Sequence, residues 1–307
     1  MAGSRGDVWK RTGFAISPGT SREVMSVIGS IGVYSSNQRF AWRGMSSADY
    51  DVQSSLHRLL GHNTTESDLR AAEIGILKEA RDWGLGVGES THVDDLGLLA
   101  DLQHYGVPTR LIDFTSNPMT ALWFACQTPH DNTASRSGVV VALNVTKLKK
   151  YASVGNAYSN TWVGLENPSG STLASALATP QPFVVESSHP NDRLRAQEGF
   201  FVAGAVPTTS SFARRLTSPF FSIGVEFKSG ADGETERRLT SARGQGAPNS
   251  LPFVAVVISA GLKQKLRSYL EGTFNRRAKV LFPDFAGFKD LSSYPSLRNK
   301  YATKASP

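Results

Sequence analysis

The sequence of 307 residues contains a single cysteine, Cys126, which excludes a disulfide framework and any metal site built from several cysteines. No apolar run approaches the roughly 20 residues that a membrane-spanning helix needs. The first thirteen residues, MAGSRGDVWKRTG, lack the apolar core of a secretory signal. These absences predict a cytoplasmic protein in a reducing compartment, with no membrane partner.

Motifs that would identify a common enzyme class are absent as well. The sequence has no phosphate-binding loop ending in Gly-Lys-Ser/Thr, no GxGxxG after a strand and no HExxH, and its six histidines lack metal-ligand spacing. Cys126 falls on the apolar face of an expected helix, where a free cysteine usually belongs to the core. Any chemistry must therefore come from other polar residues, and we expect no metal.

Basic residues exceed acidic ones, with 33 Lys and Arg against 26 Asp and Glu, a net charge of +7 and a pI near 9.5. Such a charge favours acidic partners such as nucleic acid or phosphorylated ligands. A charge that only keeps the protein soluble explains the same numbers equally well. Arginines in the second half form scattered pairs, such as Arg214–Arg215 and Arg237–Arg238, which favours a basic groove over a basic tail.

Hydrophobic periodicity divides the chain into helices and strands. Helices are predicted over 21–32, 64–84, about 92–105, from 118 onward and over 260–274. Strands are predicted over 39–45, 138–145, 181–187, 199–206, 220–228 and 251–259. The helix over 64–84 begins with a capping-box pattern, Thr65 followed by Asp68, and Ser116 or Asn117 is expected to cap the helix that starts at Pro118.

This order of elements predicts the fold class α+β, with N-terminal helices followed by a mixed, mostly antiparallel sheet in a single domain over residues 21–290. Residues 1–20 are polar and rich in Gly and Ser, so we expect a flexible arm there. Two further segments of similar composition, near 152–178 and 229–250, are expected to be mobile loops. Residues 291–307 would then form a C-terminal tail.

A first polar cluster lies in FAWRG, where Arg43 ends an expected strand beside Gly44. An arginine in that position can aim its planar guanidinium into a cleft, where it suits a carboxylate or phosphate. A surface salt bridge is the simpler explanation of the same pattern.

A second cluster lies in QHYGVPTRLIDFTS, residues 103–116, which includes His104, Tyr105, Arg110 and Asp113. Pro108 disfavours helix in the residue before it, so these side chains lie in a connector between two helices. Polar connectors on rigid scaffolds often carry binding or catalytic residues. The structural alternative, which we expect to come first, is an ion pair of Arg110 with Asp113 that fixes the connector.

A third cluster lies in NDRLRAQEGFFV, residues 191–202, where Arg193, Arg195, Gln197 and Glu198 lead into a buried strand. The start of a strand is a suitable place for a catalytic carboxylate. Charged residues at strand starts are also common without any function.

Together these segments resemble the FRG domain, a bacterial and phage-borne family named for a Phe-Arg-Gly signature. FAWRG (40–44) has Trp42 where the family usually has phenylalanine, and LLADLQHYGVPTRLIDFTSNPMTALWFA (98–125) follows the central family pattern closely. RLRAQEGFFV (193–202) and LKQKLRSYLEGTFNRRAKVLFPDFAGF (262–288) are similar to the later family segments, the last ending in an LFPDL-G strand. The resemblance spans roughly residues 39–288.

The same clusters are similar, in order and residue type, to the three motifs of ADP-ribosyltransferases of the Arg–Ser–Glu type. Those enzymes have an arginine on an early strand, then a Ser/Thr-x-Ser strand that leads into A--FA, then Glu/Gln-x-Glu at a strand start. Arg43, FTSNPMTALWFA (114–125) and AQEGFF (196–201) occur in this order. The resemblance implies a split sheet and NAD as co-substrate.

The resemblance also implies a role for each residue. Arg43 would hold the pyrophosphate or the adenosine-side ribose, Thr115 or Ser116 would support the nicotinamide ribose, and Tyr105 or Phe124 could stack on nicotinamide. The full candidate set is Arg43, Gln197 and Glu198 for catalysis, Arg43, Gly44, Tyr105, Arg110, Thr115, Ser116 and Phe124 for NAD, and His104, Asp113, Arg193 and Arg195 for the acceptor.

Gln197 and Glu198 compete for the position that contacts the ribose 2′-hydroxyl. Adjacent residues on a strand face opposite sides, so only one of them can face the cleft. We expect Gln197 to face it, with Gly199 on the same side, while Glu198 points out and pairs with Arg195 or contacts the acceptor. In that case the catalytic carboxylate is missing, or Asp113 replaces it.

The resemblance therefore implies an NAD-dependent ADP-ribosyltransferase whose acceptor is DNA or RNA, acting as a bacterial toxin or anti-phage effector with an antitoxin protein as a further partner. One alternative is a non-catalytic nucleotide- or RNA-binding module. Another is a hydrolase or nuclease that uses His104 and Asp113 as acid and base.

Overall fold

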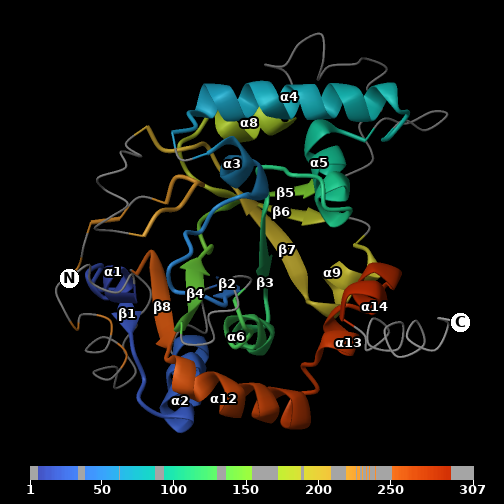
Figure 1. Cartoon of the computed structure of the whole chain (residues 1–307). Helices are drawn as coiled ribbons and strands as arrows, with labels where there is room; N and C mark the ends of the chain where they lie inside the picture. Colours follow the sequence, from blue (N-terminus) through green and yellow to red (C-terminus); the bar gives the residue numbers. More distant parts are fainter. Residues whose placement is uncertain are drawn as a thin grey trace, which may run out of the picture.

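Eight strands form one mixed sheet at the centre of the molecule (Figure 1). In sheet order they are β1 (Ala15–Ile16), β8 (Phe253–Ile258), β4 (Gly138–Asn144), β2 (Phe40–Met45), β3 (Ile112–Thr115), β7 (Gly199–Ala203), β6 (Phe183–Ser187) and β5 (Lys149–Ser153). The outer pairs β1–β8 and β5–β6 are parallel and the remaining neighbours are antiparallel. The predicted α+β fold with a mixed, mostly antiparallel sheet is confirmed.

The structure is a computed structural model of the whole chain. It describes residues 6–33, 39–61, 63–86, 93–129, 136–153, 172–187, 190–208, 219–225 and 251–291, together with single residues between 227 and 239.

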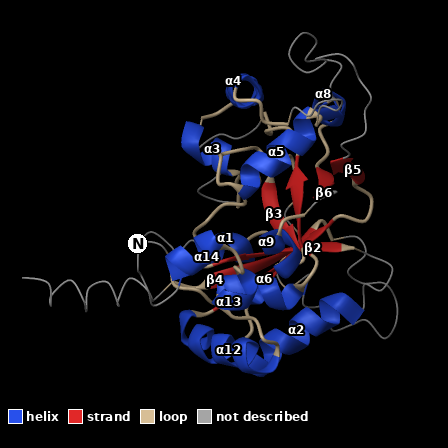
Figure 2. Cartoon of the chain, turned by 90° about the vertical axis from the view of Figure 1, so that its right-hand side faces the viewer, coloured by secondary structure: helices blue, strands red, loops and turns tan. Residues whose placement is uncertain are grey.

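The sheet is split between β2 and β3. β2 is paired with β4 along its whole length, from Phe40 to Met45, and β3 is paired with β7 at four positions. In contrast, β2 and β3 share a single registered pair, Trp42 with Thr115. The strands of the two halves run at a steep angle to each other in Figure 2. One side of the split is therefore lined by β2 and the other by β3.

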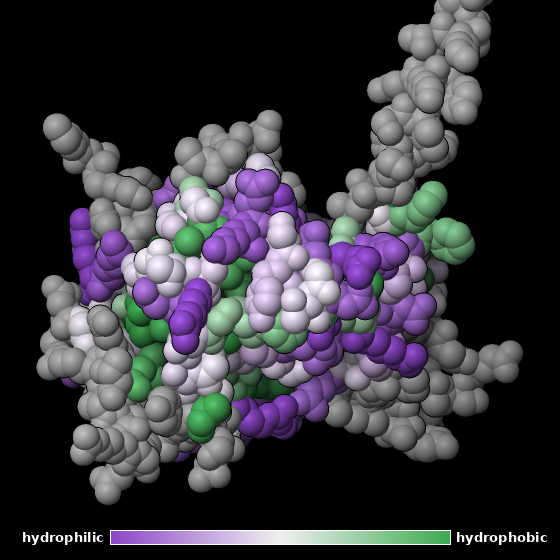
Figure 3. Space-filling model, turned by 90° about the horizontal axis from the view of Figure 1, so that it is seen from below, coloured by the Kyte–Doolittle hydropathy of each residue, from purple (hydrophilic) through white to green (hydrophobic). Residues whose placement is uncertain are grey.

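The helices form groups around the two halves (Figure 1). The first group, at the bottom of the view, is α2 (Ser21–Val33), α6 (Pro118–Ala125) and α12 (Ala260–Thr273). The second group, at the top, is α3 (Ser55–Leu60), α4 (Glu66–Asp82), α5 (Asp95–His104) and α8 (Thr172–Leu177). The third group, at the right, is α9 (Asp192–Ala196), α13 (Ala278–Leu281) and α14 (Phe285–Leu291). Seen from below, the molecule shows mainly hydrophilic side chains with separate hydrophobic patches (Figure 3).

The hydrophobic core contains two main clusters. One large cluster packs α2 and α12 against β4 and β8, through residues such as Ile28, Leu266 and Val140. A second cluster packs α5 and α8 against β6 and β7, through residues such as Leu99 and Phe201. The larger cluster also includes Ile112, Phe114 and Phe200 of β3 and β7, so it continues across the split, whereas the smaller cluster supports only the half around β6 and β7.

Local sequence signals set the helix starts as predicted. The Thr65 side chain accepts the Asp68 backbone N–H, and Asp68 accepts the Thr65 backbone N–H, so the capping box of α4 is formed. Of the two candidates for α6, Asn117 is the cap, because its Oδ1 accepts the backbone N–H of Met119. Pro118 occupies the first turn, where its missing N–H costs nothing.

The expectation of a flexible arm over residues 1–20 is wrong for the described part, residues 6–20. Residues Gly6–Lys10 form α1, and β1 pairs in parallel with β8. Trp9 and Phe14 are only 1% and 6% exposed. Two aromatic side chains in a polar context were enough to anchor this segment, because their rings pack edge-on against Phe253 in the core.

Two predicted strands are also corrected. Within 220–228 Phe221 makes an isolated bridge with Val52, and no strand forms in the described part of this segment. Phe221 is nevertheless buried, so this apolar run indicated residues that pack in the core and not residues that pair in the sheet. The segment LFPDFAG (281–287), expected as a strand, instead covers the end of α13 and the start of α14, with Phe282 between them.

The expected mobile loops fall largely outside the described residues. Within 152–178 the described ends belong to β5 and α8, so the loop expectation is wrong for 172–177. Most of 229–250 and of the tail 291–307 lies outside the described residues.

Candidate functional site

Gly44 allows β2 and α6 to approach each other beside the split of the sheet. A Cβ atom at this position would lie 1.7 Å from the carbonyl oxygen of Ala121 in α6, a distance that no side chain can accept. The glycine of the FAWRG segment therefore has a structural role: it lets α6 close one side of the split.

A pocket of about 330 Å³ lies at this split. Its walls come from β2, β3, α9, the C-terminal end of α5, the inner face of α6, and Phe282 in the connection between α13 and α14. The lining residues are Trp42, Arg43, Gly44, Gln103, His104, Asp113, Phe114, Thr115, Thr120, Phe124, Arg193, Leu194, Gln197 and Phe282. The three polar clusters of the sequence thus contribute to a single pocket.

Arg43 brings a charged donor to this pocket. Its Nη1 donates to the backbone oxygen of Asp113 at 2.5 Å, which ties β2 to β3 across the split. Its Nε is buried and has no hydrogen-bond partner. Burial lowers the pKa of Arg43 from its ordinary value, the charge of Asp113 acts in the opposite direction, and Arg58 adds to the lowering. Since arginine remains protonated even so, the pocket keeps a positive charge with an unused N–H.

Two more polar atoms of the pocket lack partners. The Nε2 atom of His104 and the Oγ1 atom of Thr120 are both buried without a hydrogen bond. Burial lowers the pKa of His104 from its ordinary value of 6.5, although Asp101 and Asp113 act against this, so the imidazole is neutral at pH 7. Buried polar groups are nearly always hydrogen-bonded in proteins. Three residues with unsatisfied groups therefore line one pocket, and such local exceptions are expected mainly at functional sites.

Asp113 lines the pocket on β3 and is held there by Gln103. The Nε2 atom of Gln103 donates to Asp113 Oδ2 at 3.2 Å, and its Oε1 accepts the Thr109 hydroxyl at 2.8 Å. Gln103 was not among the predicted site residues, although it stands next to His104 in the sequence. Gln103 could have been predicted because it is the first residue of the second polar cluster, QHYGVPTRLIDFTS.

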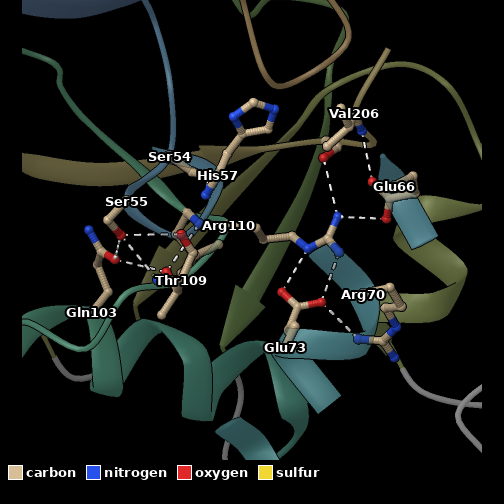
Figure 4. Close-up of polar contacts among 12 residues, drawn as sticks. Ser54, Ser55, His57, Glu66, Arg70, Glu73, Gln103, Thr109, Arg110 and Val206 are labelled. Carbon is tan, nitrogen blue, oxygen red and sulfur yellow. Dashed lines mark hydrogen bonds and ion pairs between the residues drawn. The ribbon is translucent and has the colours of Figure 1, made fainter. Parts of the chain in front are cut away.

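Contrary to the prediction, Asp113 does not form an ion pair with Arg110. Arg110 is buried outside the pocket lining, where its Nε and Nη2 bind both carboxylate oxygens of Glu73 at 2.7 and 2.9 Å (Figure 4). Its Nη1 donates to Glu66 and to the backbone oxygen of Gly204. Burial acts against the charge, but Glu73 and Glu66 outweigh it and raise the pKa of Arg110. Arg110 therefore supports the fold and does not line the pocket.

Gln197 lines the pocket and Glu198 does not, as expected, but the physical reason differs from the predicted one. Neither residue is on a strand: Gln197 caps the C-terminus of α9, and Glu198 has a positive φ of 50° before β7 begins at Gly199. The Gln197 Nε2 donates to the Leu281 backbone oxygen at 3.0 Å, which fixes the amide at the pocket wall. The side chains of Gln197 and Glu198 therefore differ in direction because Glu198 has a left-handed backbone conformation, and not because residues of a strand alternate between two faces.

Glu198 is bound outside the pocket. Its Oε1 accepts from Arg276 Nη2 and from Asn117 Nδ2, both at 2.8 Å, and its side chain is 44% exposed. The expected pairing with Arg195 is therefore wrong, because Arg276, far along the chain, reaches Glu198. Arg195 is exposed and lies outside the pocket lining.

Thr115 connects two of the motifs. Its hydroxyl donates to the backbone oxygen of Gln197 at 2.6 Å and accepts the backbone N–H of Asn117. Ser116 and Tyr105, two other predicted NAD-binding residues, lie outside the pocket lining: the Ser116 hydroxyl donates to the Glu198 backbone oxygen, and Tyr105 is 87% exposed. Thr115 thus lines the pocket while its hydroxyl holds α9 against β3.

The wall opposite β2 is formed by Arg193 and Phe282. Arg193 binds both carboxylate oxygens of Asp284 at 2.7 and 2.8 Å, and its guanidinium carbon lies 5.1 Å from the centre of the Phe282 ring. Phe282 packs against Phe124, so two aromatic rings face the pocket together. Phe282 could not be found from its own segment, which carried no polar motif of its own.

Other candidate chemistries find no support among the described residues. Burial raises the pKa of the Cys126 thiol to about 12, so the thiol stays protonated, and the expected core position of this residue is confirmed. Over the part of the chain that the structure describes, no group of three or more His, Cys, Asp or Glu side chains could hold a metal ion. No helix in the same part is long and apolar enough to cross a membrane.

Residues 38–134 match the family model of the FRG domain, so the chain carries an FRG domain over this range. The match includes β2, α5, β3 and α6, which supply most of the pocket wall. The later segments, 193–202 and 262–288, lie beyond the matched range, although the structure brings Gln197 and Phe282 to the same pocket. No curated protein and no solved structure matches the chain.

Proposed function

We propose that this FRG-domain protein is a cytoplasmic ADP-ribosyltransferase that uses NAD as co-substrate and modifies a nucleic acid. The observation that carries the proposal is the arrangement of the three transferase-like motifs. Their strands, β2, β3 and β7, are neighbours in the sheet, and Arg43, Thr115 and Gln197 line one pocket at its split. Residues so far apart in the sequence have no local reason to converge.

The size and chemistry of the pocket suit the nicotinamide end of NAD. A volume of about 330 Å³ is at the lower end of the range for small-molecule sites, so the pocket would hold nicotinamide with its ribose, leaving the adenosine outside. Phe124 and Phe282 offer an apolar surface to the nicotinamide ring. The unused N–H of Arg43 would bind a pyrophosphate oxygen or a ribose hydroxyl, since the guanidinium group suits phosphate.

The reaction would break the bond between nicotinamide and ribose. Its transition state resembles an oxocarbenium ion, which is stabilised by nearby negative charge and by hydrogen bonds to the ribose hydroxyls. The Gln197 amide, fixed by Leu281, is placed to contact a ribose hydroxyl, and the buried Thr120 hydroxyl offers another hydrogen bond.

A nucleic-acid acceptor is supported by the surface near the pocket. The net charge is +7, and α14, which adjoins α13, presents Phe285 and Phe288 with exposed fractions of 95% and 62%. Lys279 and Lys289 are exposed on the same two helices. Exposed aromatic rings among basic residues bind single-stranded nucleic acid by stacking on the bases and attracting the phosphates.

The test is to incubate purified protein with NAD and with single-stranded DNA or RNA. We expect release of nicotinamide and a gain in the mass of the nucleic acid equal to one ADP-ribose per modified base. Arg43→Met should lose most of this activity. Arg22→Met removes an exposed arginine of α2 outside the pocket and serves as the matched control.

A wild-type protein that releases no nicotinamide with either nucleic acid would contradict the proposal, as would an Arg43→Met variant as active as Arg22→Met. Expression in bacteria provides a second readout, since modification of nucleic acid should stop growth. Wild-type expression would then be toxic while Arg43→Met is tolerated, as expected of a toxin or anti-phage effector that an antitoxin protein restrains.

A hydrolase or nuclease is the second candidate, because His104 and Asp113 line the same pocket. A neutral imidazole beside a carboxylate can act as a base. The same incubation separates the two functions, since a nuclease shortens the nucleic acid without NAD and adds no mass to it.

A further inference from the structure

Glu198 is poorly placed to supply negative charge to the pocket. It lies outside the lining residues, and its Oε1 is shared between Arg276 and Asn117. Asn117 uses its other side-chain atom, Oδ1, to cap α6, so Glu198 is bound to a fixed point of the fold. Turning Glu198 inward would break its ion pair and leave Arg276 without a counter-charge.

Asp113 is the only carboxylate among the described residues that line the pocket. It lies on β3, on the same face as Thr115 two residues later, and its backbone oxygen accepts the hydrogen bond from Arg43. The carboxylate is therefore close to the charged donor proposed to bind NAD. Its position on a strand makes it more rigid than a loop residue would be.

The amide of Gln103 fixes the orientation of this carboxylate, because its Nε2 donates to Asp113 Oδ2. The Thr109 hydroxyl accepts the Leu111 backbone N–H, and the Ser55 hydroxyl accepts the Thr109 backbone N–H, so both hydroxyl protons remain to be donated. The Thr109 hydroxyl donates to Gln103 Oε1 at 2.8 Å, whereas the single Ser55 proton is shared between Gln103 Oε1 at 3.4 Å and the Thr109 backbone oxygen at 3.3 Å (Figure 4). The Nε2 end of Gln103 must then point toward Asp113.

We propose that Asp113 is the catalytic carboxylate of the pocket and that Gln103 is its positioning residue; this inference rests on the proposed function. The bond between ribose C1′ and the nicotinamide nitrogen breaks, and its electron pair leaves with neutral nicotinamide. Asp113 stabilises the positive charge that develops on the ribose. An N–H or O–H group of the nucleic acid attacks C1′, and its proton passes to Asp113 and then to solvent.

The test compares two isosteric variants, Asp113→Asn and Glu198→Gln, by nicotinamide release and by NAD binding. Asp113→Asn should lower kcat at least about 100-fold, the scale of a lost acid–base group, with the Kd for NAD within about threefold of wild type. Glu198→Gln should keep most of the activity. The inference is overturned if Asp113→Asn keeps most of its turnover, or if Glu198→Gln alone abolishes it.

Gln197→Ala gives a further comparison, because the amide contributes hydrogen bonding without charge. A loss of about tenfold or more in kcat is expected there, smaller than the loss in Asp113→Asn. If Gln197→Ala loses more than Asp113→Asn, the amide and not the carboxylate dominates, and the assignment is wrong.

The positioning role of Gln103 has its own readout. Gln103→Ala should lower kcat about tenfold with little change in KM, because the Asp113 carboxylate would no longer be held in one orientation. A merely structural residue would lower stability and change kcat and KM together. A wild-type protein that releases no nicotinamide would overturn both the proposed function and this inference, whereas an active Asp113→Asn would overturn only the inference.

Discussion

Arg43 and Arg110 lie in two polar regions beside β3, and they differ in how completely the protein satisfies them. Each of the three nitrogen atoms of Arg110 has a partner, from Glu73, Glu66 or Gly204. Arg43 donates to the backbone oxygen of Asp113, and its buried Nε has no partner. The same side chain thus closes a structural network in one region and leaves bonding capacity free in the other.

The difference has a physical origin. The Arg110 network joins α4 to the sheet, because Glu73 and Glu66 both belong to α4 and Glu66 also accepts the Val206 backbone N–H (Figure 4). Ions removed from water need this full set of partners. Polar groups left unsatisfied around a pocket lower stability, and such exceptions to local consistency occur mainly at functional sites. Both residues are arginines, so the residue type does not separate their roles. The number of satisfied hydrogen bonds does: Arg110 stabilises the fold, and Arg43 is a candidate for ligand binding.

The largest expected effect is on the Arg110 side. Arg110→Met should lower the free energy of unfolding by about 3–5 kcal/mol, because the buried Glu73 carboxylate would lose its counter-charge. Urea unfolding followed by circular dichroism measures it, with the exposed Arg195→Met as control. A loss under about 1 kcal/mol would show that the network is not the structural element described here.

The second effect concerns the wall of the pocket itself. Gly44→Ala should lower the free energy of unfolding by about 3 kcal/mol, because its Cβ would force β2 and α6 apart. Gly29→Ala is the matched control, since a Cβ there meets nothing within 4 Å in α2 and alanine should be neutral or slightly stabilising. Equal stability of the two variants would mean that the close approach at Gly44 is not required.

The third effect is on binding and not on stability. Arg43→Lys keeps the charge but loses the planar fork, so the Kd for NAD should rise about tenfold, or about 1.4 kcal/mol, while unfolding changes by less than about 1 kcal/mol. Isothermal titration with NAD measures the first and urea unfolding the second. If Arg43→Lys were as unstable as Arg110→Met, Arg43 would also be a structural residue, and the proposed difference between the two arginines would be wrong.

The smallest effect is a pH dependence from the pocket. The folded-state pKa of His104 lies below its ordinary value of 6.5 because burial disfavours the charged form. The stability linked to neutral His104 is therefore complete above pH 6.5 and is lost as the pH falls through the folded-state pKa. Urea unfolding between about pH 7.5 and 5 should show a shallower decline for His104→Gln than for wild type. Identical slopes would mean that the imidazole titrates as in the unfolded chain.

Local features of the sequence determined most of the elements. The capping box at Thr65, the Asn117–Pro118 start of α6 and the apolar runs of β4 and β8 are encoded within a few residues, so periodicity and caps located them. The density of the motif around His104 also identified much of the pocket. Composition failed for residues 6–20, because two buried aromatic side chains outweighed a polar background.

The tertiary structure alone decided which charges meet. Arg110 binds Glu73, 37 residues away, instead of Asp113 three residues away, and Glu198 binds Arg276, 78 residues away, instead of the nearby Arg195. Phe282 reaches the pocket for the same reason. Helix and strand formation depend on neighbours along the chain, whereas ion pairs and pocket walls depend on distances that exist only after the strands have paired and the helices have packed on the sheet.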